Sequence, residues 1–152
     1  MQKAMEIRYT MSFHIGSVTQ HKLWYLPMHQ CWVSSGKDLM LNRFRLVDRK
    51  GLALEEPVKI HEDEITDIVE IESPIKCIVT CSMDKQIRMF NLEHKRMIRV
   101  FPQHHKASMH KMIYFEHYGR YLLSAGGEWD IYVWMVDNVV DDPLYGKLGG
   151  HK

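Results

Sequence analysis

The feature of this sequence that most constrains its fold is an internal repeat. Residues 32–46 align without a gap on residues 78–92, which follow 46 positions later, and residues 122–136 repeat the pattern after a further 44. A fixed period of this size is typical of repeat architectures, in which each repeat is one unit of supersecondary structure. The repeat therefore constrains the architecture before local propensity does, because each unit must bury its apolar face against a neighbour.

A histidine stands upstream of each copy. These histidines are His14, His61 and His105, and a fourth, His151, follows at a similar interval. From His61 and His105, apolar residues follow at +4 and +7 and an acidic residue at +23, whereas the unit after His14 is looser. The whole chain, 1–152, is thus divided into three repeats, with an outer strand of a preceding unit before them and the start of another unit after them. In chain order these segments are 7–13, 14–60, 61–104, 105–150 and 151–152.

Each unit has the residue pattern of four short strands. In the second unit, residues 64–71 follow the histidine and residues 77–81 form a β-branched run. After a tight turn at the acidic residue, residues 87–92 alternate between two faces of a third strand. Fourth strands are expected at residues 58–60, 97–101 and 144–148. The pattern predicts an all-β fold built from four-stranded antiparallel sheets.

These units resemble the WD-repeat (WD40) β-propeller family, whose repeat has about 40 to 45 residues and four strands. Gly150 and His151 match the Gly-His pair near the start of that repeat, and residues 124–126 and 130–134 match its second and third strands. The resemblance covers residues 7 to 152 and implies about three blades of an incomplete propeller. The third unit is also similar to the long WD-repeat proteins of ciliary axonemes.

The resemblance implies a hydrogen-bonded set inside each blade, made by the loop histidine, a Ser or Thr, the turn acid and a third-strand Trp. Such a set is physically reasonable, because a buried imidazole and a buried carboxylate both need partners. None of the three sets is complete, since Phe44 and Phe90 lack an indole N–H and Glu128 is longer than Asp. The implied members are His14, Ser34, Asp38, Phe44, His61, Thr80, Asp84, Phe90, His105, Ser124, Glu128 and Trp134. The turn glycine of the family is replaced by Leu39, Lys85 and Trp129.

The same resemblance predicts where partners bind. The histidine loops and the acidic turns emerge on one face of a propeller, and binding residues are often carried by such loops on a rigid scaffold. Trp129 is the most informative of them, because aromatic anchors dominate interface energies; the alternative is that it folds back over its own blade. The candidate partner-binding residues are Trp129, Lys85, Met83, Lys37, Leu39 and Lys106.

Composition and charge exclude other classes of protein. With 45% hydrophobic residues among 152, the chain can form a core and is not largely disordered. Twenty Lys and Arg against 19 Asp and Glu leave a net charge of +1, so no charge excess favours nucleic acid or a membrane as partner. The three cysteines and the charged start predict a reducing, intracellular and cytoplasmic location. The axonemal resemblance adds the cilium.

Several clusters suggest sites, and each has a simpler structural interpretation. Cys77 and Cys81 fit metal ligation or a core of small apolar side chains. The histidines 104, 105 and 110 lack a carboxylate or Cys to complete a metal shell. Aromatic residues between 114 and 121 fit a base-stacking platform, but their spacing also fits two strands of a blade. We therefore expect no metal, no cofactor and no catalytic group.

The sequence thus predicts a noncatalytic scaffold that binds other proteins. The alternatives are an enzyme with a propeller channel, for which only Thr66, Asp67 and Glu70 are candidate polar residues, and a piece without independent function. A closed propeller takes about four to eight blades, so three units fall short. We expect the ring to be completed by further blades, from the same longer chain or from another chain.

Overall fold

The computed structural model describes residues 21–47, 51–137 and 142–149, and these residues form an all-β fold of three antiparallel sheets. Sheet A contains β1 (His21–Leu26), β2 (Cys31–Gly36), β3 (Met40–Val47), β4 (Gly51–Leu54) and β5 (Val58–Lys59). Sheet B contains β6 (Ile65–Ile71), β7 (Cys77–Ser82), β8 (Ile87–Asn91) and β9 (Arg96–Val100). Sheet C contains β10 (Met109–Glu116), β11 (Arg120–Gly126), β12 (Ile131–Met135) and β13 (Leu144–Leu148). In this part of the chain, no helix has the length and apolar character needed to cross a membrane.

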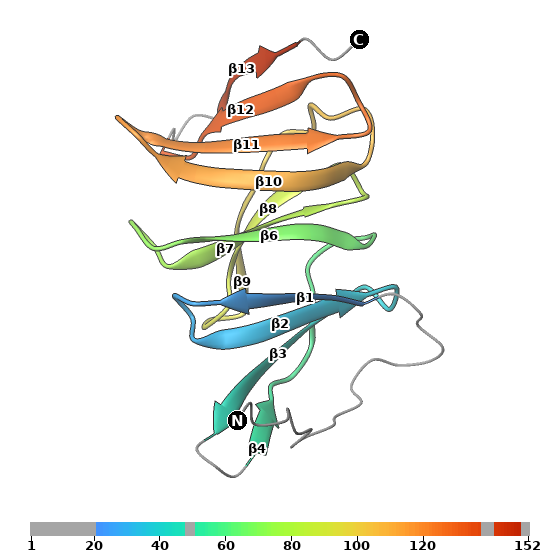
Figure 1. Cartoon of the computed structure of the whole chain (residues 1–152), viewed down its shortest axis with the longest axis vertical. Coiled ribbons are helices and arrows are strands. Elements are labelled where there is room, and N and C mark those ends of the chain that lie inside the picture. The colour runs from blue at the N-terminus through green and yellow to red at the C-terminus, as the bar shows by residue number, and fades with distance from the viewer. Residues whose placement is uncertain (1–20, 48–50, 138–141, 150–152) are drawn as a thin grey trace, which may run out of the picture.

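The three sheets are stacked like blades, with sheet B between the other two (Figure 1). In sheets B and C the spatial order of the strands is their order in the chain, and each pairs antiparallel with the next. The expected fold class, with about three four-stranded antiparallel blades, is therefore present. The strands of each sheet come from a single repeat.

Sheet A differs from the expected pattern at its outer edge. One fourth strand was expected at residues 58–60, but two short strands, β4 and β5, both pair with β3. The physical reason is the length of β3. It has eight residues against five in β8, so its C-terminal half pairs with β4 while Met40 and Leu41 pair with β5.

The core lies between the sheets, and strand alternation decides which residues enter which layer. On β7, Cys77, Val79 and Cys81 point into the layer shared with sheet C, whereas Ile78 points into the layer shared with sheet A. Every residue of β7 is buried, as expected for a strand covered on both faces. Sheet B therefore binds the stack together.

Some expected segments cannot be compared with the structure. The strand predicted at 7–13, the histidine His14 and the further unit predicted at 151–152 lie outside the described residues.

Candidate partner-binding rim

The turns and loops at one end of the strands form the surface that we call the rim. It comprises residues 36–39, 60–64, 82–86, 104–108 and 126–130, which are the turns after β2, β7 and β11 and the loops before β6 and β10. The sequence placed its candidate binding residues on these segments. The described histidines and acids of the implied sets belong to these same segments, and the hydroxyls lie on the adjoining strands β2, β7 and β11.

In sheet C, all four members of the implied set are in contact. The His105 ring nitrogen Nδ1 contacts the Glu128 carboxylate, and its Nε2 lies 2.6 Å from Ser124 Oγ. The Trp134 indole donates to the same Ser124 Oγ over 2.8 Å. His105, Ser124 and Trp134 are at most 2% exposed. Glu128 thus fills the place of the shorter Asp, and its oxygens also accept the backbone N–H of Lys106 at 3.2 and 3.3 Å.

In sheet B, three members of the set are in contact. His61 Nδ1 lies 2.9 Å from an Asp84 carboxylate oxygen, and His61 Nε2 lies 2.8 Å from Thr80 Oγ1. Phe90 is buried at the Trp position and offers no donor. Asp84 also accepts the backbone N–H of Glu62 at 3.1 Å, which matches the Lys106 contact in sheet C. The same loop is therefore fastened to the same turn in both sheets.

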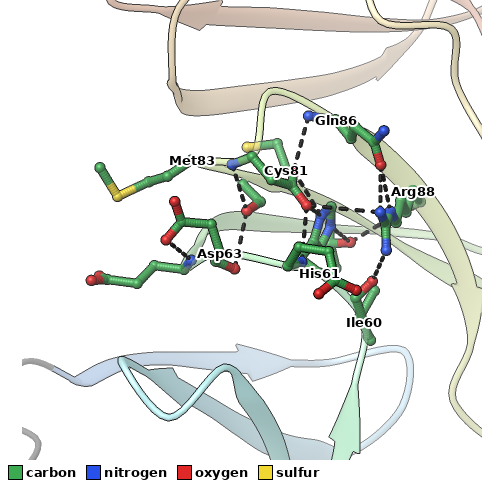
Figure 2. A network of polar contacts seen from close by, with 12 residues as sticks. Ile60, His61, Asp63, Cys81, Met83, Gln86 and Arg88 are labelled. Atoms are coloured by element: carbon green, nitrogen blue, oxygen red, sulfur yellow. Dashed lines mark hydrogen bonds and ion pairs between the residues drawn. The ribbon is translucent and has the colours of Figure 1, made fainter.

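An arginine completes the sheet B network where sheet C has an aromatic ring. The Arg88 guanidinium donates to the Ile60 carbonyl and to the Gln86 side chain (Figure 2). At the equivalent position of sheet C, Tyr132 places its ring centroid 4.2 Å from that of His105. No role for Arg88 was predicted from the sequence. Its position opposite Thr80 on the paired strand was the available signal, because cross-strand neighbours share a face.

The protonation of the two sets is controlled by different groups. Burial lowers the pKa of His105 below 6.5, although Glu128 acts in the opposite direction. For Asp84, burial raises the pKa, but hydrogen bonds from His61 and from two backbone N–H groups outweigh it and lower the pKa below 3.8. At neutral pH, His105 is therefore a neutral imidazole that donates from Nδ1 to Glu128, and Asp84 is a carboxylate.

In sheet A, the described members occupy equivalent places. Ser34 and Phe44 are buried on β2 and β3, and Asp38 accepts the backbone N–H of Met40 at 3.2 Å. Asp84 accepts the N–H of Gln86 in the same way, at 3.0 Å. The acidic turns of sheets A and B are thus built alike.

The residues that replace the turn glycine adopt two conformations. Leu39 has a φ of 63° and Lys85 a φ of 69°, in the left-handed region that favours glycine. Each closes a tight turn, since their N–H groups donate to Gly36 and Ser82 respectively. Trp129 is not among the described non-glycine residues with positive φ. The third turn therefore avoids the strain of the other two.

Three candidate binding residues are exposed and close together on the rim. Ser108 Oγ donates to the Met83 carbonyl, and the Gly127 N–H donates to the Ser108 carbonyl, which joins the sheet B turn to the sheet C turn. Met83 is 36% exposed and Trp129 65%, and Lys106 is also exposed. In Figure 2 the Met83 side chain extends away from the buried network. Most of the Trp129 surface is therefore exposed.

The other three candidates lie on neighbouring turns. Lys85 is half-buried beside Met83, and on sheet A Lys37 is exposed while Leu39 is half-buried. Lys85 and Leu39 have positive φ values. The backbone conformation of the turn is therefore a stronger constraint on these two positions than their solvent exposure.

The polar residues of the innermost strand β6 join neighbouring sheets. Asp67 is 2% exposed; it accepts the Trp24 indole N–H at 3.3 Å and the Met112 backbone N–H at 2.9 Å, and Lys111 Nζ lies 3.0 Å away. Glu70 pairs with His29 over 2.7 Å. The sequence considered Asp67 and Glu70 only as channel residues. Their role as links could not be found without knowing which strands of sheets A and C lie beside β6.

The remaining clusters have structural surroundings. Cys77 and Cys81 are fully buried between sheets B and C, and burial raises the pKa of their thiols to about 11 and about 12. His104 lies 2.6 Å from Asp142, at the surface. Within the described residues, no group of three or more His, Cys, Asp or Glu side chains is arranged to hold a metal ion.

Comparison of the chain with protein-family models and with curated proteins finds no match in either case.

Proposed function

We propose that this chain is a noncatalytic platform for binding other proteins, and that the rim around Trp129 is its binding surface. The observation that carries the proposal is a large aromatic side chain, 65% exposed, on a turn whose base is fixed by buried hydrogen bonds. An aromatic anchor on a rigid support loses little conformational entropy on binding.

The rigidity of this turn follows from its contacts. Glu128 binds the buried His105 and the backbone of Lys106, so the residue before Trp129 is held on two sides. Gly126 contacts the opposite loop so closely that a Cβ there would lie 2.2 Å from the Ser108 carbonyl oxygen. The turn and the loop therefore act as one rigid unit, from which the Trp129 side chain extends.

The surroundings of Trp129 favour a mixed apolar and polar interface. Met83, on the neighbouring turn, adds a flexible apolar side chain of the kind that adapts to irregular partner surfaces. Lys106 adds a positive charge at the edge of the same surface. This combination of aromatic residue, Met and peripheral charge resembles the core and rim of protein interfaces.

The inner-strand contacts favour a scaffold over an enzyme. The enzyme alternative needs polar groups that are available to a substrate, and Asp67 and Glu70 are engaged by neighbouring sheets. Thr66 Oγ1 lies 3.3 Å from the Cys81 carbonyl oxygen. These three side chains have structural partners.

We also propose that the chain is a WD-repeat protein of the cytoplasm, and that the ciliary axoneme is a place to look for it. The repeated contact of histidine, hydroxyl and turn acid in sheets B and C supports the proposal that it is a WD-repeat protein. Fluorescence microscopy of the tagged chain in ciliated cells tests the second part, and exclusion from cilia would overturn it.

The binding surface is tested by affinity purification from cell extract with quantitative mass spectrometry. We expect Trp129→Ala to reduce recovery of a specific partner at least about tenfold, as for an interface anchor. The matched control is Tyr118→Ala, because Tyr118 is 97% exposed and lies in the β10–β11 turn, at the other end of β11. Tyr118→Ala should leave recovery unchanged.

Equal recovery with Trp129→Ala and the unsubstituted chain would remove Trp129 from the interface. Catalytic turnover by the purified chain, with no partner recovered, would overturn the scaffold proposal itself.

A further inference from the structure

The outer face of sheet C is an apolar surface. It carries Ile113 at 57% exposure, Phe115 at 41%, Tyr145 at 67% and Leu148 at 55%. A hollow of about 440 Å³ on this face is lined by Phe115, Tyr121, Leu123, Val133, Tyr145 and Leu148 with Gly146 and Lys147. A continuous apolar patch of this kind marks an interaction site.

The equivalent face of sheet B is covered. Positions 71, 77, 79 and 87 of sheet B are at most 2% exposed, because sheet C packs on them. The same positions 44 residues later are Phe115, Tyr121, Leu123 and Ile131, and each is exposed or half-buried. The outer face of sheet C is therefore equivalent to the face of sheet B on which sheet C packs.

The other end of the stack has the complementary face. On sheet A, Leu23 and Tyr25 pair across from Ser34 and Trp32 and point away from sheet B. They are 64% and 55% exposed. Ser34 on β2 and Phe44 on β3 are already buried, so the open part of this face consists of Leu23 and Tyr25 on β1 with the half-buried Trp32 on β2.

Each of these two faces carries a row of aromatic rings, although Phe44 at the end of the sheet A row is buried. Tyr25, Trp32 and Phe44 form a row across sheet A, with centroid separations of 5.1 and 6.1 Å. Phe115, Tyr121 and Tyr145 form a row across sheet C, with separations of 5.5 and 5.8 Å. Aromatic residues are enriched where separate chains meet. In the covered layer between sheets B and C, the equivalents of Phe115 and Tyr121 are the smaller Ile71 and Cys77.

We propose that two copies of this chain associate head to tail, with the outer face of sheet C of one copy packed on the β1–β2 face of the other. This contact continues the geometry by which sheet C packs on sheet B within one chain. A contact between unlike faces closes into a ring or grows into a filament. Two copies supply six sheets, within the roughly four to eight that closed propellers contain, so the contact closes at the dimer.

The association is tested by light scattering of the purified chain during size-exclusion chromatography. We expect a particle of twice 18.1 kDa. Ile113→Asp and Tyr25→Asp each place an unpaired carboxylate in one of the two faces and should weaken the dimer at least about a hundredfold in dissociation constant. Both sites are exposed, so the far-ultraviolet circular dichroism of the variants should stay unchanged.

The matched control is Ile75→Asp. Ile75 is 51% exposed, close to the exposure of Ile113, but lies in the β6–β7 connection. This variant should remain a dimer.

Mixing the two disruptive variants distinguishes unlike faces from like faces. A dimer of one Ile113→Asp chain and one Tyr25→Asp chain has two contacts between a sheet C face and a sheet A face. One of these contacts carries both aspartates and the other carries neither. Mixing the two variants should therefore restore a dimer. A monomeric unsubstituted chain would overturn the proposal, as would a Tyr25→Asp variant that stays dimeric or a mixture that stays monomeric. An open-ended series of larger particles would overturn closure at two copies.

Discussion

Sheets B and C fix the same loop to the same turn with different residues. In sheet C, the Trp134 indole donates to Ser124, and Tyr132 lies against His105. In sheet B, Phe90 has no donor, and Arg88 binds the Ile60 carbonyl just before His61. The histidine, the hydroxyl and the acid are the common part, and the fourth contact is interchangeable.

The comparison shows that the two sets differ in their sources of stability. Sheet C has an aromatic enclosure and one indole hydrogen bond. Sheet B has more polar contacts, because the Arg88 guanidinium adds bonds to the Ile60 carbonyl and to Gln86. The set of sheet B therefore has other support although it lacks the indole, since the Thr80 hydroxyl donates to the Arg88 carbonyl and the Arg88 guanidinium binds the Ile60 carbonyl.

The largest effect is expected from removing the histidines themselves. His61→Ala and His105→Ala should each lower the free energy of unfolding by about 3 kcal/mol, because each removes the imidazole that joins a largely buried carboxylate to a buried hydroxyl. Urea denaturation followed by circular dichroism measures the change. The control is His94→Ala, an exposed histidine in the β8–β9 turn. A cost below about 1 kcal/mol in one sheet would show that its set does not hold that sheet together.

Exchanging the aromatic residues tests the fourth contact. Trp134→Phe should cost about 1 to 2 kcal/mol, because Ser124 loses the indole hydrogen bond and the buried site loses volume. Phe90→Trp should not stabilise sheet B and should cost about 1 to 3 kcal/mol by overpacking a buried position. Thermal and urea unfolding measure both, with Trp129→Phe as the exposed control. A stabilising Phe90→Trp would mean that sheet B is a defective copy of sheet C.

Acidification should affect the two sheets in different pH ranges. The pKa of His105 is lowered below 6.5 in the folded chain, so the unfolded chain binds more protons and stability falls as the pH drops below 6.5. The pKa of Asp84 is lowered below 3.8, so its contribution persists until the pH falls below 3.8.

Urea denaturation at stepped pH values tests this separation. Substitution of His105→Asn should flatten the dependence of the unfolding free energy between about pH 5 and pH 7, whereas Asp84→Asn should preserve it. An unchanged slope in His105→Asn would assign that dependence to another group.

The smallest effect concerns the turns. Lys85→Gly should stabilise the chain by about 1 kcal/mol, because glycine adopts the left-handed conformation at 69° without steric cost. Trp129→Gly should give no gain, since Trp129 is not among the described residues with positive φ. The melting temperatures of the two variants measure the difference. Equal gains would mean that the turns are strained alike.

Much of the fold could be predicted from the sequence, because the repeat and the strand alternation are local patterns. The expected residues 144–148 coincide with β13, and 77–81 fall within β7. The double outer edge of sheet A was not predictable, because the pairing of β4 and β5 depends on the length of β3.

The candidate site was predictable in part. Periodicity and resemblance named His105, Ser124 and Glu128, which lie in contact. The sequence did not indicate that Glu128 would reach both the imidazole and the Lys106 backbone, since that depends on the path of the turn.

By itself the sequence determined the three sheets of the described residues, their antiparallel strands and the residues that enter the layers, because a period of two and a period near 45 can be read along the chain alone. Only the tertiary structure decided which polar groups satisfy one another and which faces stay open. Asp67 is a link between three sheets because Trp24, Lys111 and Met112 come close to it in space. Burial and pairing across sheets depend on stacking, and stacking joins residues that are more than 40 positions apart in the chain.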